Sequence, residues 1–450
     1  MTAPQLKREL SAFDLTMIAI GSTIGSGIFL TPSLVAQSLD SPLWILGAWV
    51  VGGIMALCGA LTFAELGGMF PSAGGMYVYL SEAYGKLAGF LFGWAYFLVV
   101  NTGGIAALSI AFATYLGFFI PLGPTGTQVV AIGGLLLVTA LNVYGVKMGG
   151  IFSDVFTLLK LAGIAGLIIV GFLMGSSTTT DFSAQLHNTS GGLGSALAAA
   201  MVGILWSYGG WQHASFTAGE AKNPRHSVPL AMIIGACVVT VVYLLANLSY
   251  LFLLPVHEVA ASSRLASDAI SRVLGPNGGA MIALAISIST FGSVGIFTLT
   301  APRIYFAMAG DGVFFERVAE VHPRYQTPAF AIIVQSAWAI VLILLWGTFD
   351  KLISYVVFTD WIFFGLTGAS IFIFRKRSPG AQRPYKAFGY PVTPSIFVGI
   401  SVWFVVNTLL HQAVQAAAGL GFLAVGLGVF YYWRRVKRRE TATQSSLHDG

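Results

Sequence analysis

The sequence predicts an all-α, polytopic membrane protein, and three observations favour this fold class. The first is composition: 56% of the 450 residues are hydrophobic and 9% are charged, whereas soluble domains carry about 25% charged residues. The second is a mean hydropathy of +0.81. The third is that apolar runs of about 20 residues, long enough to cross a bilayer core of roughly 30 Å as helices, recur along the chain. We therefore expect residues 1–450 to form a single membrane domain.

Loop signals divide the apolar runs into twelve predicted membrane spans. Their approximate limits are 14–37, 43–68, 86–119, 127–146, 151–174, 193–219, 228–254, 277–308, 328–346, 352–374, 391–411 and 416–433. The glycine-containing stretch 71–79 and the charged stretch 311–325 are interpreted as cytoplasmic connections, and residues 434–450 as a cytoplasmic tail.

The first span contains a glycine-rich stretch, Gly21 to Phe29, that an uninterrupted membrane helix would avoid. Gly21, Gly25 and Gly27 each weaken a helix by roughly 1 kcal/mol relative to alanine. An opened backbone at membrane depth is tolerated only where it is buried in protein or lines a water-filled cavity. The stretch is therefore expected to line a binding site. The alternative is that the same glycines form a small-residue packing face between straight helices.

A second interruption lies in the sixth span, where Gly209 and Gly210 stand together inside the run from Trp206 to Gln212. The two interruptions therefore occupy the first positions of two sets of five spans. Because five is odd, the two sets cross the membrane in opposite directions, as an inverted repeat requires, and such paired interruptions indicate a binding site near the bilayer midplane. The resulting limits are about 14–174 for the first repeat, about 193–374 for the second and about 391–433 for spans eleven and twelve.

The basic residues are distributed unevenly along the chain. Counting twelve spans from a cytoplasmic N-terminus places 19 of the 23 Lys and Arg on the cytoplasmic side, Lys160 inside a span, and only Arg264, Arg272 and Lys351 in outside loops. This asymmetry follows the positive-inside rule and predicts that both termini are cytoplasmic. The first 13 residues are polar and no small-residue cleavage site follows the first apolar run, so we expect a retained first helix rather than a signal peptide.

Several short motifs together resemble a known family. They are Gly25-Ser-Gly-Ile-Phe29 followed by Pro32, Glu65-Leu66 followed by Pro71-Ser-Ala-Gly-Gly-Met-Tyr77, Tyr208-Gly-Gly-Trp211, Phe291-Gly-Ser-Val294, and Arg383-Pro-Tyr385 followed by Gly389-Tyr-Pro391. The combination resembles the amino acid, polyamine and organocation (APC) superfamily and is most similar to its L-type amino acid transporter (LAT) branch. The resemblance implies a LeuT-type fold of twelve transmembrane helices. In that fold a 5+5 inverted repeat has discontinuous helices 1 and 6, helices 11 and 12 follow the repeat, and the implied substrate is a neutral amino acid.

The broken first span offers a site for a carboxylate. A half-helix that begins near Gly25, Ser26 and Gly27 would direct unpaired N–H groups and the positive end of its dipole toward the cavity. Glycine lets a ligand approach the backbone closely, and the Ser26 hydroxyl adds a donor. In the resembled family the corresponding backbone groups hold the substrate carboxylate.

The ammonium group of an amino acid needs hydrogen-bond acceptors instead. Candidate carbonyls lie where the first half-helix ends, at Ile20, Gly21 and Thr23, and in span six, at Trp206, Ser207 and Gly209. The side chains expected to set selectivity are those of Trp206, Tyr208, Trp211 and Gln212. An aromatic residue at the position of Trp206 is a gate in the resembled family. Ordinary packing of these aromatic residues is the alternative.

Lys160 is the most unusual charged residue. It lies about ten residues into span five, roughly 15 Å from the cytoplasmic end, which exceeds the reach of its side chain. Placing a lysine there costs on the order of 3 kcal/mol, so it needs a partner. In the resembled branch a lysine at this position occupies the place where sodium-coupled relatives hold a sodium ion. We therefore expect the Lys160 ammonium to donate to carbonyls near Gly21 and transport to be independent of sodium. The alternative is a lysine in a polar crevice with no coupling role.

Two other ionisable residues lie inside predicted spans. Asp360 lies about nine residues into span ten, where burial would let its carboxyl carry a coupled proton, although relatives commonly have a neutral residue at this position. His213 is close to the second interruption, and we interpret it as a hydrogen-bonded structural residue.

The remaining polar residues receive structural interpretations. Glutamates at cytoplasmic helix ends are expected to be solvated caps or loop salt bridges: Glu65, Glu82 and Glu220. Cys58 and Cys237 are expected to be small buried side chains. Residues 188–190 spell a glycosylation sequon, which is a weak signal by itself.

These features favour a secondary active transporter or exchanger of neutral L-amino acids that is sodium-independent and works by alternating access. Two alternatives stay open. A cationic amino acid or polyamine permease would need an acidic residue facing the substrate, which neither broken span contains, and the other alternative is a proton-coupled amino acid symporter. An enzyme is not expected, because the seven histidines are scattered and no catalytic cluster forms at one depth. There is no P-loop pattern, and we expect no cofactor, metal or nucleic acid partner.

The expected partners are a small-molecule substrate and the lipid bilayer of a plasma (inner) membrane. Many animal transporters of the resembled branch are joined by a disulfide to a single-span heavy subunit, through a cysteine in the loop after span three. Here that loop, about 118–127, contains no cysteine, so no disulfide-linked heavy subunit is expected. The oligomeric state and the identity of the amino acid stay open.

Overall fold

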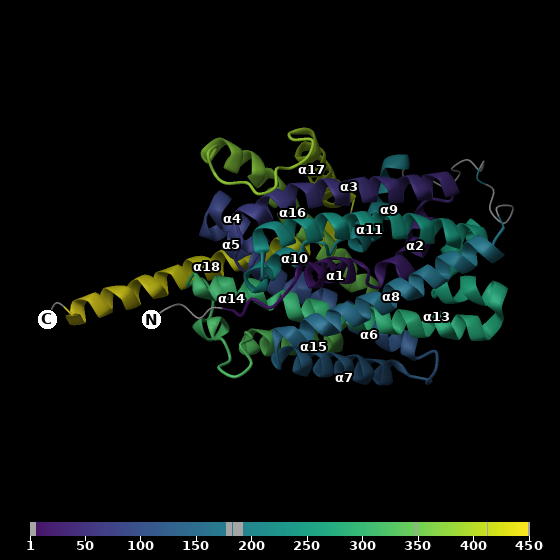
Figure 1. Ribbon diagram of the computed structural model, residues 1–450, viewed down its shortest axis with the longest axis horizontal. Coiled ribbons are helices and arrows are strands. Elements are labelled where there is room, and N and C mark those ends of the chain that lie inside the picture. The colour runs from purple at the N-terminus through teal and green to yellow at the C-terminus, as the bar shows by residue number, and fades with distance from the viewer. Residues whose placement is uncertain (1–5, 177–181, 183–191, 347–348, 412, 449–450) are drawn as a thin grey trace.

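The computed structural model describes residues 6–176, 182, 192–346, 349–411 and 413–448. Helices dominate these residues and lie side by side in one elongated bundle (Figure 1). Among the described residues, ten helical stretches are long and apolar enough to cross a membrane, and two shorter apolar helices, Leu193–Tyr208 and Ala329–Leu345, accompany them. The protein is therefore a helical multi-pass membrane protein, as its composition predicts.

The helices follow one another with mostly short connections. Their limits are α1 (Ala12–Thr23), α2 (Gly27–Ser38), α3 (Pro42–Met69), α4 (Met76–Tyr84), α5 (Lys86–Ala95), the π-helix η1 (Tyr96–Val100), α6 (Asn101–Leu116), α7 (Pro124–Val143), α8 (Val146–Met174), α9 (Leu193–Tyr208), α10 (His213–Phe216), the 3₁₀-helix η2 (Ala218–Glu220), α11 (Pro224–Leu253), α12 (Val256–Ala261), α13 (Leu265–Thr300), α14 (Pro302–Gly310), the 3₁₀-helix η3 (Glu316–Ala319), α15 (Ala329–Trp346), α16 (Phe349–Arg377), α17 (Val392–His411) and α18 (Ala413–His448).

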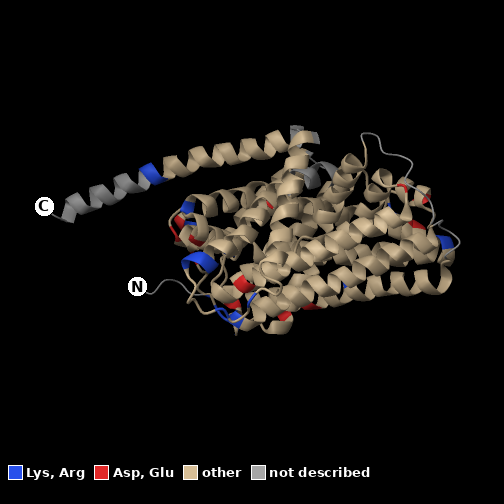
Figure 2. Cartoon of the chain, turned by 90° about the horizontal axis from the view of Figure 1, so that it is seen from above, with Lys and Arg blue, Asp and Glu red and all other residues tan. Residues whose placement is uncertain are grey.

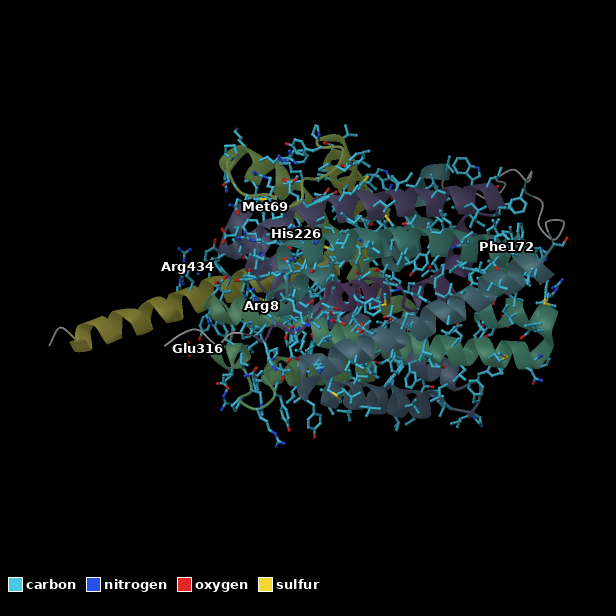
Figure 3. The ribbon with its side chains drawn as sticks, viewed as in Figure 1. Arg8, Met69, Phe172, His226, Glu316 and Arg434 are labelled. Atoms are coloured by element: carbon cyan, nitrogen blue, oxygen red, sulfur yellow. The ribbon has the colours of Figure 1, made fainter. Side chains whose placement is uncertain are left out.

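The bundle has two ends. The terminal end carries the N-terminal segment and the protruding part of α18, and Arg8, Met69, Glu316 and Arg434 lie there (Figure 3). Phe172 lies at the opposite end, which we call the far end (Figure 3). Charged residues gather at the two ends, and the helices between them carry few charges (Figure 2). This distribution is the one expected of a bundle that spans a bilayer.

The first predicted span is broken, as its glycines predict. α1 ends at Thr23 and α2 begins at Gly27. Between them Ile24 leaves the helical conformation, with φ −78° and ψ 87°. The small-residue packing alternative, which assumed straight helices, therefore does not hold for this segment.

The sixth span is broken as well. α9 ends at Tyr208, after which Gly209 is extended with ψ 146° and Gly210 has φ 133°. Residues with a Cβ atom rarely adopt a backbone conformation with positive φ, so this position favours glycine. A Cβ atom there would also lie 2.5 Å from the amide nitrogen of Thr23. The two breaks are therefore in direct backbone contact.

The broken helices lie inside the bundle. α1 packs against α11 and α8, and α2 packs against α9 and α12. α13 packs on α8 and α6 and covers another side of the interior. An aromatic cluster of Trp49, Tyr208 and Tyr243, with ring centroids 5.2 to 5.7 Å apart, joins α3, α9 and α11. The interior position of the breaks matches the rule that opened backbone at membrane depth is shielded from lipid.

The third predicted span is continuous but contains the π-helix η1, which the sequence did not predict. The wider π turn lets Thr102 Oγ1 donate to the carbonyl of Phe97, five residues earlier, at 2.7 Å. A π-bulge inside an α-helix often marks a functional site. Its residues, Tyr96 to Val100, are ordinary apolar and aromatic residues, so no local signal distinguishes them from a regular helix.

Two predicted boundaries were wrong. α13 begins at Leu265, well before the predicted span eight, because Gly275 takes φ 70° and lets an outer helix run into the span through a kink. α18 continues to His448 through the predicted tail, whose Arg, Lys, Glu and Ala residues are strong helix formers.

One cysteine also differs from expectation. Cys58 is buried, but Cys237 is exposed on the outer face of α11, where the lipid side of a span accepts an apolar side chain. The sequon at residues 188–190 and the side chain of Lys351 lie outside the described residues.

Glu65, at the terminal end of α3, is fully buried, so the expectation of a solvated cap was wrong and the salt-bridge alternative holds. Arg375 donates to both carboxylate oxygens at 3.0 and 2.6 Å, and Arg383 donates to Oε1 at 3.1 Å. The amide of Ala387 donates to Oε2 at 2.7 Å. The carboxylate thus ties α3 to α16 and to the loop before α17, whereas Glu82 is exposed.

Glu220 is also fully buried and closes the terminal end of the bundle. Arg303 of α14 donates to its two carboxylate oxygens at 2.8 and 2.7 Å, and neither side chain has exposed surface. The carbonyl of Glu220 accepts from the amides of Glu9 and Leu10, both at 2.9 Å. Here too the predicted solvated position was wrong, because a paired carboxylate can be buried where a single one cannot.

Further contacts close the same end. The hydroxyl of Tyr77 donates to Asp311 at 2.7 Å and joins α4 to the end of α14. Burial and the Asp311 carboxylate raise the pKa of Tyr77, so this hydroxyl stays protonated at physiological pH. The amide of Gly74 donates to the carbonyl of Phe216 at 3.1 Å and joins the loop before α4 to α10.

We predict that Glu65→Gln lowers the thermal unfolding temperature of the purified protein. The change leaves two arginines without their carboxylate, a loss on the order of 3 kcal/mol for a buried pair. Glu82→Gln is the matched control, because Glu82 lies at the same end but is exposed. Differential scanning fluorimetry in detergent measures both variants. Equal unfolding temperatures for the two would contradict the role given to Glu65.

Candidate functional site

The two breaks meet at one cavity inside the bundle. The Ser22 hydroxyl donates to the carbonyl of Gly210 at 2.8 Å, so the broken segments of α1 and α9 touch beside it. The space open to the centres of water molecules is about 40 Å³, and one water needs about 10–15 Å³ on this measure. The predicted residues that line the cavity are Thr23, Gly25, Ser26, Gly27, Trp206, Gly209, Gln212 and Asp360.

The start of α2 provides hydrogen-bond donors to this cavity. The first amides of a helix have no intrahelical acceptor, and the helix dipole adds partial positive charge there. Ser26 is fully buried, and its Oγ atom has no hydrogen-bond partner in the described structure. Gly25, Ser26 and Gly27 all line the cavity. This end of the cavity therefore suits an anionic group such as a carboxylate.

The carbonyls at the end of α1 are already engaged. The Gly21 carbonyl accepts from Lys160 Nζ at 2.7 Å and from Ser293 Oγ at 3.0 Å. The Thr23 carbonyl accepts from the Gly25 amide at 3.0 Å and from the Tyr243 hydroxyl at 2.8 Å. A carbonyl oxygen has two lone pairs, so these two carbonyls have no free lone pair for a ligand.

The end of α9 presents main-chain carbonyls beside the cavity. The last carbonyls of a helix lack intrahelical donors, and the helix dipole places partial negative charge there. The Gly209 amide is shared between the carbonyls of Leu205 and Trp206, at 3.1 and 3.2 Å. Leu205, Trp206 and Gly209 all line the cavity. This end therefore suits a cationic group, opposite in charge to the start of α2.

Lys160 of α8 holds the broken end of α1, as the sequence predicts. Its ammonium donates to the carbonyls of Gly21 and Ile24 at 2.7 and 2.8 Å and to Ser293 Oγ at 2.7 Å. Only 1% of its surface is exposed, and it is not part of the cavity wall. All three ammonium donors are used, so the charge is shielded by oxygen atoms at membrane depth.

Several predicted site residues do not line the cavity. The Tyr208 hydroxyl donates to the carbonyl of Trp49 at 3.1 Å, and Trp211 packs edge-on against Phe63. Ser207 Oγ lies 2.7 Å from Thr31 Oγ1, in the contact between α9 and α2. Ile20 and Gly21 also lie outside the wall. For the two aromatic residues, the packing alternative describes what the structure shows.

The cavity also has a polar wall, in which His213 was noted from the sequence but Tyr96 and Asn101 were not. Tyr96 of η1 lines it, and its hydroxyl lies 3.0 Å from His213 Nε2. The other ring nitrogen of His213 lies 2.6 Å from Thr300 Oγ1, which agrees with the hydrogen-bonded role expected of this histidine. Asn101, where α6 begins, also lines the cavity and donates to Gln335 Oε1 at 3.0 Å. An asparagine inside an apolar span was the one available sequence signal for this wall.

Asp360 of α16 brings a carboxyl group to the cavity. Its Oδ1 atom is buried without a hydrogen-bond partner in the described structure. No group of three or more His, Cys, Asp or Glu side chains that could hold a metal ion occurs among the described residues. The arrangement thus combines a donor end, an acceptor end and one carboxyl group around a small space.

Residues 10–431 match the family model described as amino acid permease. The chain belongs to the amino acid permease family. Family membership agrees with a site made of helix ends, which can hold an amino acid. This permease is a transporter and not an enzyme.

The permease is similar to curated transporters over nearly its whole length. It is 33% identical to the serine/threonine exchanger SteT of Bacillus subtilis (strain 168), over 96% of this chain and 98% of the relative. It is 32% identical to the human b(0,+)-type amino acid transporter 1, over 90% of this chain and 84% of the relative. It is 29% identical to the human cystine/glutamate transporter, over 95% of this chain and 85% of the relative. These relatives confirm the predicted resemblance to the LAT branch of the APC superfamily.

We predict that Lys160→Met lowers transport by the permease at least about tenfold, because it removes charge-assisted hydrogen bonds worth about 1.5–3 kcal/mol each from the break in α1. Thr157→Val is the control, since Thr157 lies one turn away and donates a single neutral hydrogen bond, to Met17 at 3.1 Å. Uptake into proteoliposomes measures both variants. Wild-type uptake by Lys160→Met would show that the break does not depend on the ammonium.

We predict that alanine at two cavity glycines affects folding differently. Gly27→Ala places a Cβ atom 2.5 Å from Ser207 Oγ and 2.8 Å from Ser207 Cα, so α2 must move away from α9 and both stability and substrate binding should fall. Gly209→Ala meets nothing closer than 3.5 Å and only narrows the cavity, so folding should be retained while larger amino acids bind more weakly. Thermal unfolding and radioligand binding test the pair. Normal binding by Gly27→Ala would place the site elsewhere.

Proposed function

We propose that this permease exchanges small neutral L-amino acids across the membrane by alternating access, without sodium. The observation that carries the proposal is that two broken helices meet at one buried cavity, with the start of α2 on one side and the end of α9 on the other. This pairing matches the two charges of an amino acid zwitterion. The substrate carboxylate would receive hydrogen bonds from the amides at Ser26 and Gly27, and its ammonium would donate to the carbonyls at the end of α9.

The size of the cavity supports a small substrate. Space for the centres of only a few water molecules is left between the walls. Trp206 and Phe297 border this space and would limit the length of the substrate side chain. The similarity to a serine/threonine exchanger over nearly the full length of both chains points to the same size class. Amino acids of the size of serine and threonine are therefore the first substrates to test.

The transmembrane arrangement belongs to the proposal as well. We assign twelve crossings, ten of them in a LeuT-type 5+5 inverted repeat, by adding the short helices α9 and α15 to the ten long apolar stretches. Breaks in the first span of each half support the repeat. The excess of Lys and Arg on one side supports cytoplasmic termini in a plasma (inner) membrane. The permease would work without a disulfide-linked heavy subunit, because the loop between α6 and α7 has no cysteine.

Sodium independence rests on Lys160. A bound sodium ion would need the oxygen atoms of Gly21, Ile24 and Ser293, which the ammonium already occupies. A fixed positive charge at this place would also repel a cation in a low-dielectric interior. The hydrogen bonds that join α8 to the break in α1 would therefore be permanent and would not depend on a bound ion.

Alternating access requires that the closed terminal end open. In the structure this end is closed by Glu220 with Arg303, by the amides of Glu9 and Leu10, and by Tyr77 with Asp311. Arg303 joins α14 to the segment after the break in α9, the amides of Glu9 and Leu10 join the N-terminal segment to that same segment, and Tyr77 joins α4 to the end of α14. Their separation would expose the cavity to the terminal side, which we assign to the cytoplasm.

A second candidate function is a permease for cationic amino acids. The sequence argued against it, because neither broken span contains an acidic residue expected to face the substrate. The structure supplies one from another element, since Asp360 of α16 lines the cavity. A carboxylate there could pair with a cationic side chain, so this candidate is kept as an outcome of the test.

Uptake into proteoliposomes tests the proposed function. Vesicles of the purified permease preloaded with unlabelled serine should take up labelled serine faster than empty vesicles, and replacing sodium with choline should change nothing. Alanine and threonine should compete. A requirement for external sodium would overturn the role of Lys160, and competition by arginine or putrescine but by no neutral amino acid would establish the second candidate instead.

A further inference from the structure

Asp360 creates a charge imbalance in the cavity. Its Oδ1 atom is buried and has no hydrogen-bond partner in the described structure, and no lysine or arginine is part of the cavity wall. Burying an ionised carboxylate without a partner or compensating charge is costly. Lys160 does not pair with it, because Lys160 is not part of the cavity wall and its three donors are used by Gly21, Ile24 and Ser293. Among the described residues, the cavity wall therefore places no positively charged side chain beside this carboxyl group.

The neighbouring titratable groups do not supply a positively charged partner for the Asp360 carboxylate. Tyr96 and His213 are the other titratable side chains on the wall, and they are bonded to each other. The second nitrogen of His213 is bonded to Thr300, so the histidine is satisfied without an additional proton. On the elements packed against α16, Glu65 is paired with Arg375 and Arg383, and residues 392–410 of α17 include no titratable side chain. The other titratable groups on these elements do not line the cavity: Cys58, Tyr77, Tyr79, Glu82, Tyr84, Tyr115, Tyr208, Tyr431, Tyr432, Arg434 and Arg435.

The proposed substrate does not supply the charge either. A neutral amino acid is a zwitterion. In the proposed site, its carboxylate is matched by the start of α2 and its ammonium by the end of α9. With such a substrate bound, an ionised Asp360 would remain as a negative charge without a partner in the closed cavity, where buried charges are strongly disfavoured. A proton removes this charge and needs no additional space in a cavity of this size.

We propose that Asp360 binds a proton that accompanies the neutral amino acid in the loaded, closed cavity. This inference rests on the proposed function of the same site. The proton comes from water on the side to which the cavity is open, forms the O–H bond of the carboxylic acid while the cavity is closed, and returns to water when the cavity opens on the other side. No bond of the substrate changes. In the acid form, the O–H group gains a donor that can satisfy an acceptor of the cavity or the substrate.

The test is serine exchange measured over a pH series, with the same pH on both faces of the proteoliposome. Wild-type exchange should fall as pH rises and Asp360 ionises, approaching a tenfold loss per pH unit above the midpoint for a single group. Asp360→Asn has nearly the same shape and is permanently neutral, so its exchange should continue at high pH and show no such fall. A group with only a structural role would not produce an active, pH-independent variant.

Asp154→Asn is the matched control. Asp154 is a half-buried carboxyl group in the span α8, but it is not part of the cavity wall. This variant should keep the wild-type pH profile. If Asp360→Asn does not fold, the wild type decides the matter, because serine binding to the purified protein in weakly buffered solution should take up a proton that a pH indicator detects.

Three results would overturn the proposal. They are a flat wild-type profile, an Asp360→Asn variant that keeps the wild-type fall with pH, and serine binding without proton uptake. Preferred exchange of lysine over serine at every pH would also overturn it, since the substrate side chain would then supply the positive charge. Absence of exchange of any amino acid by the wild type would overturn the proposed function itself, and this inference with it.

Discussion

The architecture of the site depends on one interaction, the hydrogen bonds from the Lys160 ammonium to the broken end of α1. A helix interrupted at membrane depth leaves carbonyls without donors, and lipid offers none. Lys160 donates to the carbonyls of Gly21 and Ile24. Ser293 of α13 accepts the third hydrogen bond of the ammonium and itself donates to the carbonyl of Gly21. The penalty of a buried charge and the penalty of an opened helix thus offset each other, because each group satisfies the other. This fixes where α2 begins, and with it the position of the amides proposed to hold the substrate carboxylate.

The electrostatics of the cavity follow from that geometry. The start of α2 and the end of α9 carry opposite partial charges, and in a low-dielectric interior such charges act more strongly than in water. A zwitterion can be recognised almost entirely by main chain, which leaves side chains such as Trp206 and Asn101 to limit its size and polarity. Because Gly27 lies against Ser207 and Gly210 lies against Thr23, a movement of one broken helix is transmitted directly to the other. The segment that follows the break in α9 leads to Glu220, which forms a buried ion pair with Arg303 at the terminal end.

The sequence predicted the helical membrane class, both breaks and the contact between Lys160 and Gly21, because each rests on a strong local rule: hydropathy, paired glycines, and a lysine too deep to reach water. It did not predict the face on which a residue would lie. Tyr208 and Trp211 stand beside the glycine pair, yet their rings pack away from the cavity, and burial of Glu65 and Glu220 depends on arginines distant in sequence. The wall from η1 was missed for the same reason, since contacts between distant spans decide that Tyr96 reaches the cavity, whereas Asp360 was singled out because it is an acidic residue deep in a span.

The most direct test of the account is an experimental structure of the permease with a bound neutral amino acid such as serine. The account predicts density for the amino acid between the two breaks, with its carboxylate oxygens about 3 Å from the amide nitrogens of Ser26 and Gly27 and its ammonium at the carbonyls that end α9. Density for the amino acid outside this cavity, or inside it with the carboxylate directed away from the start of α2, would contradict the account.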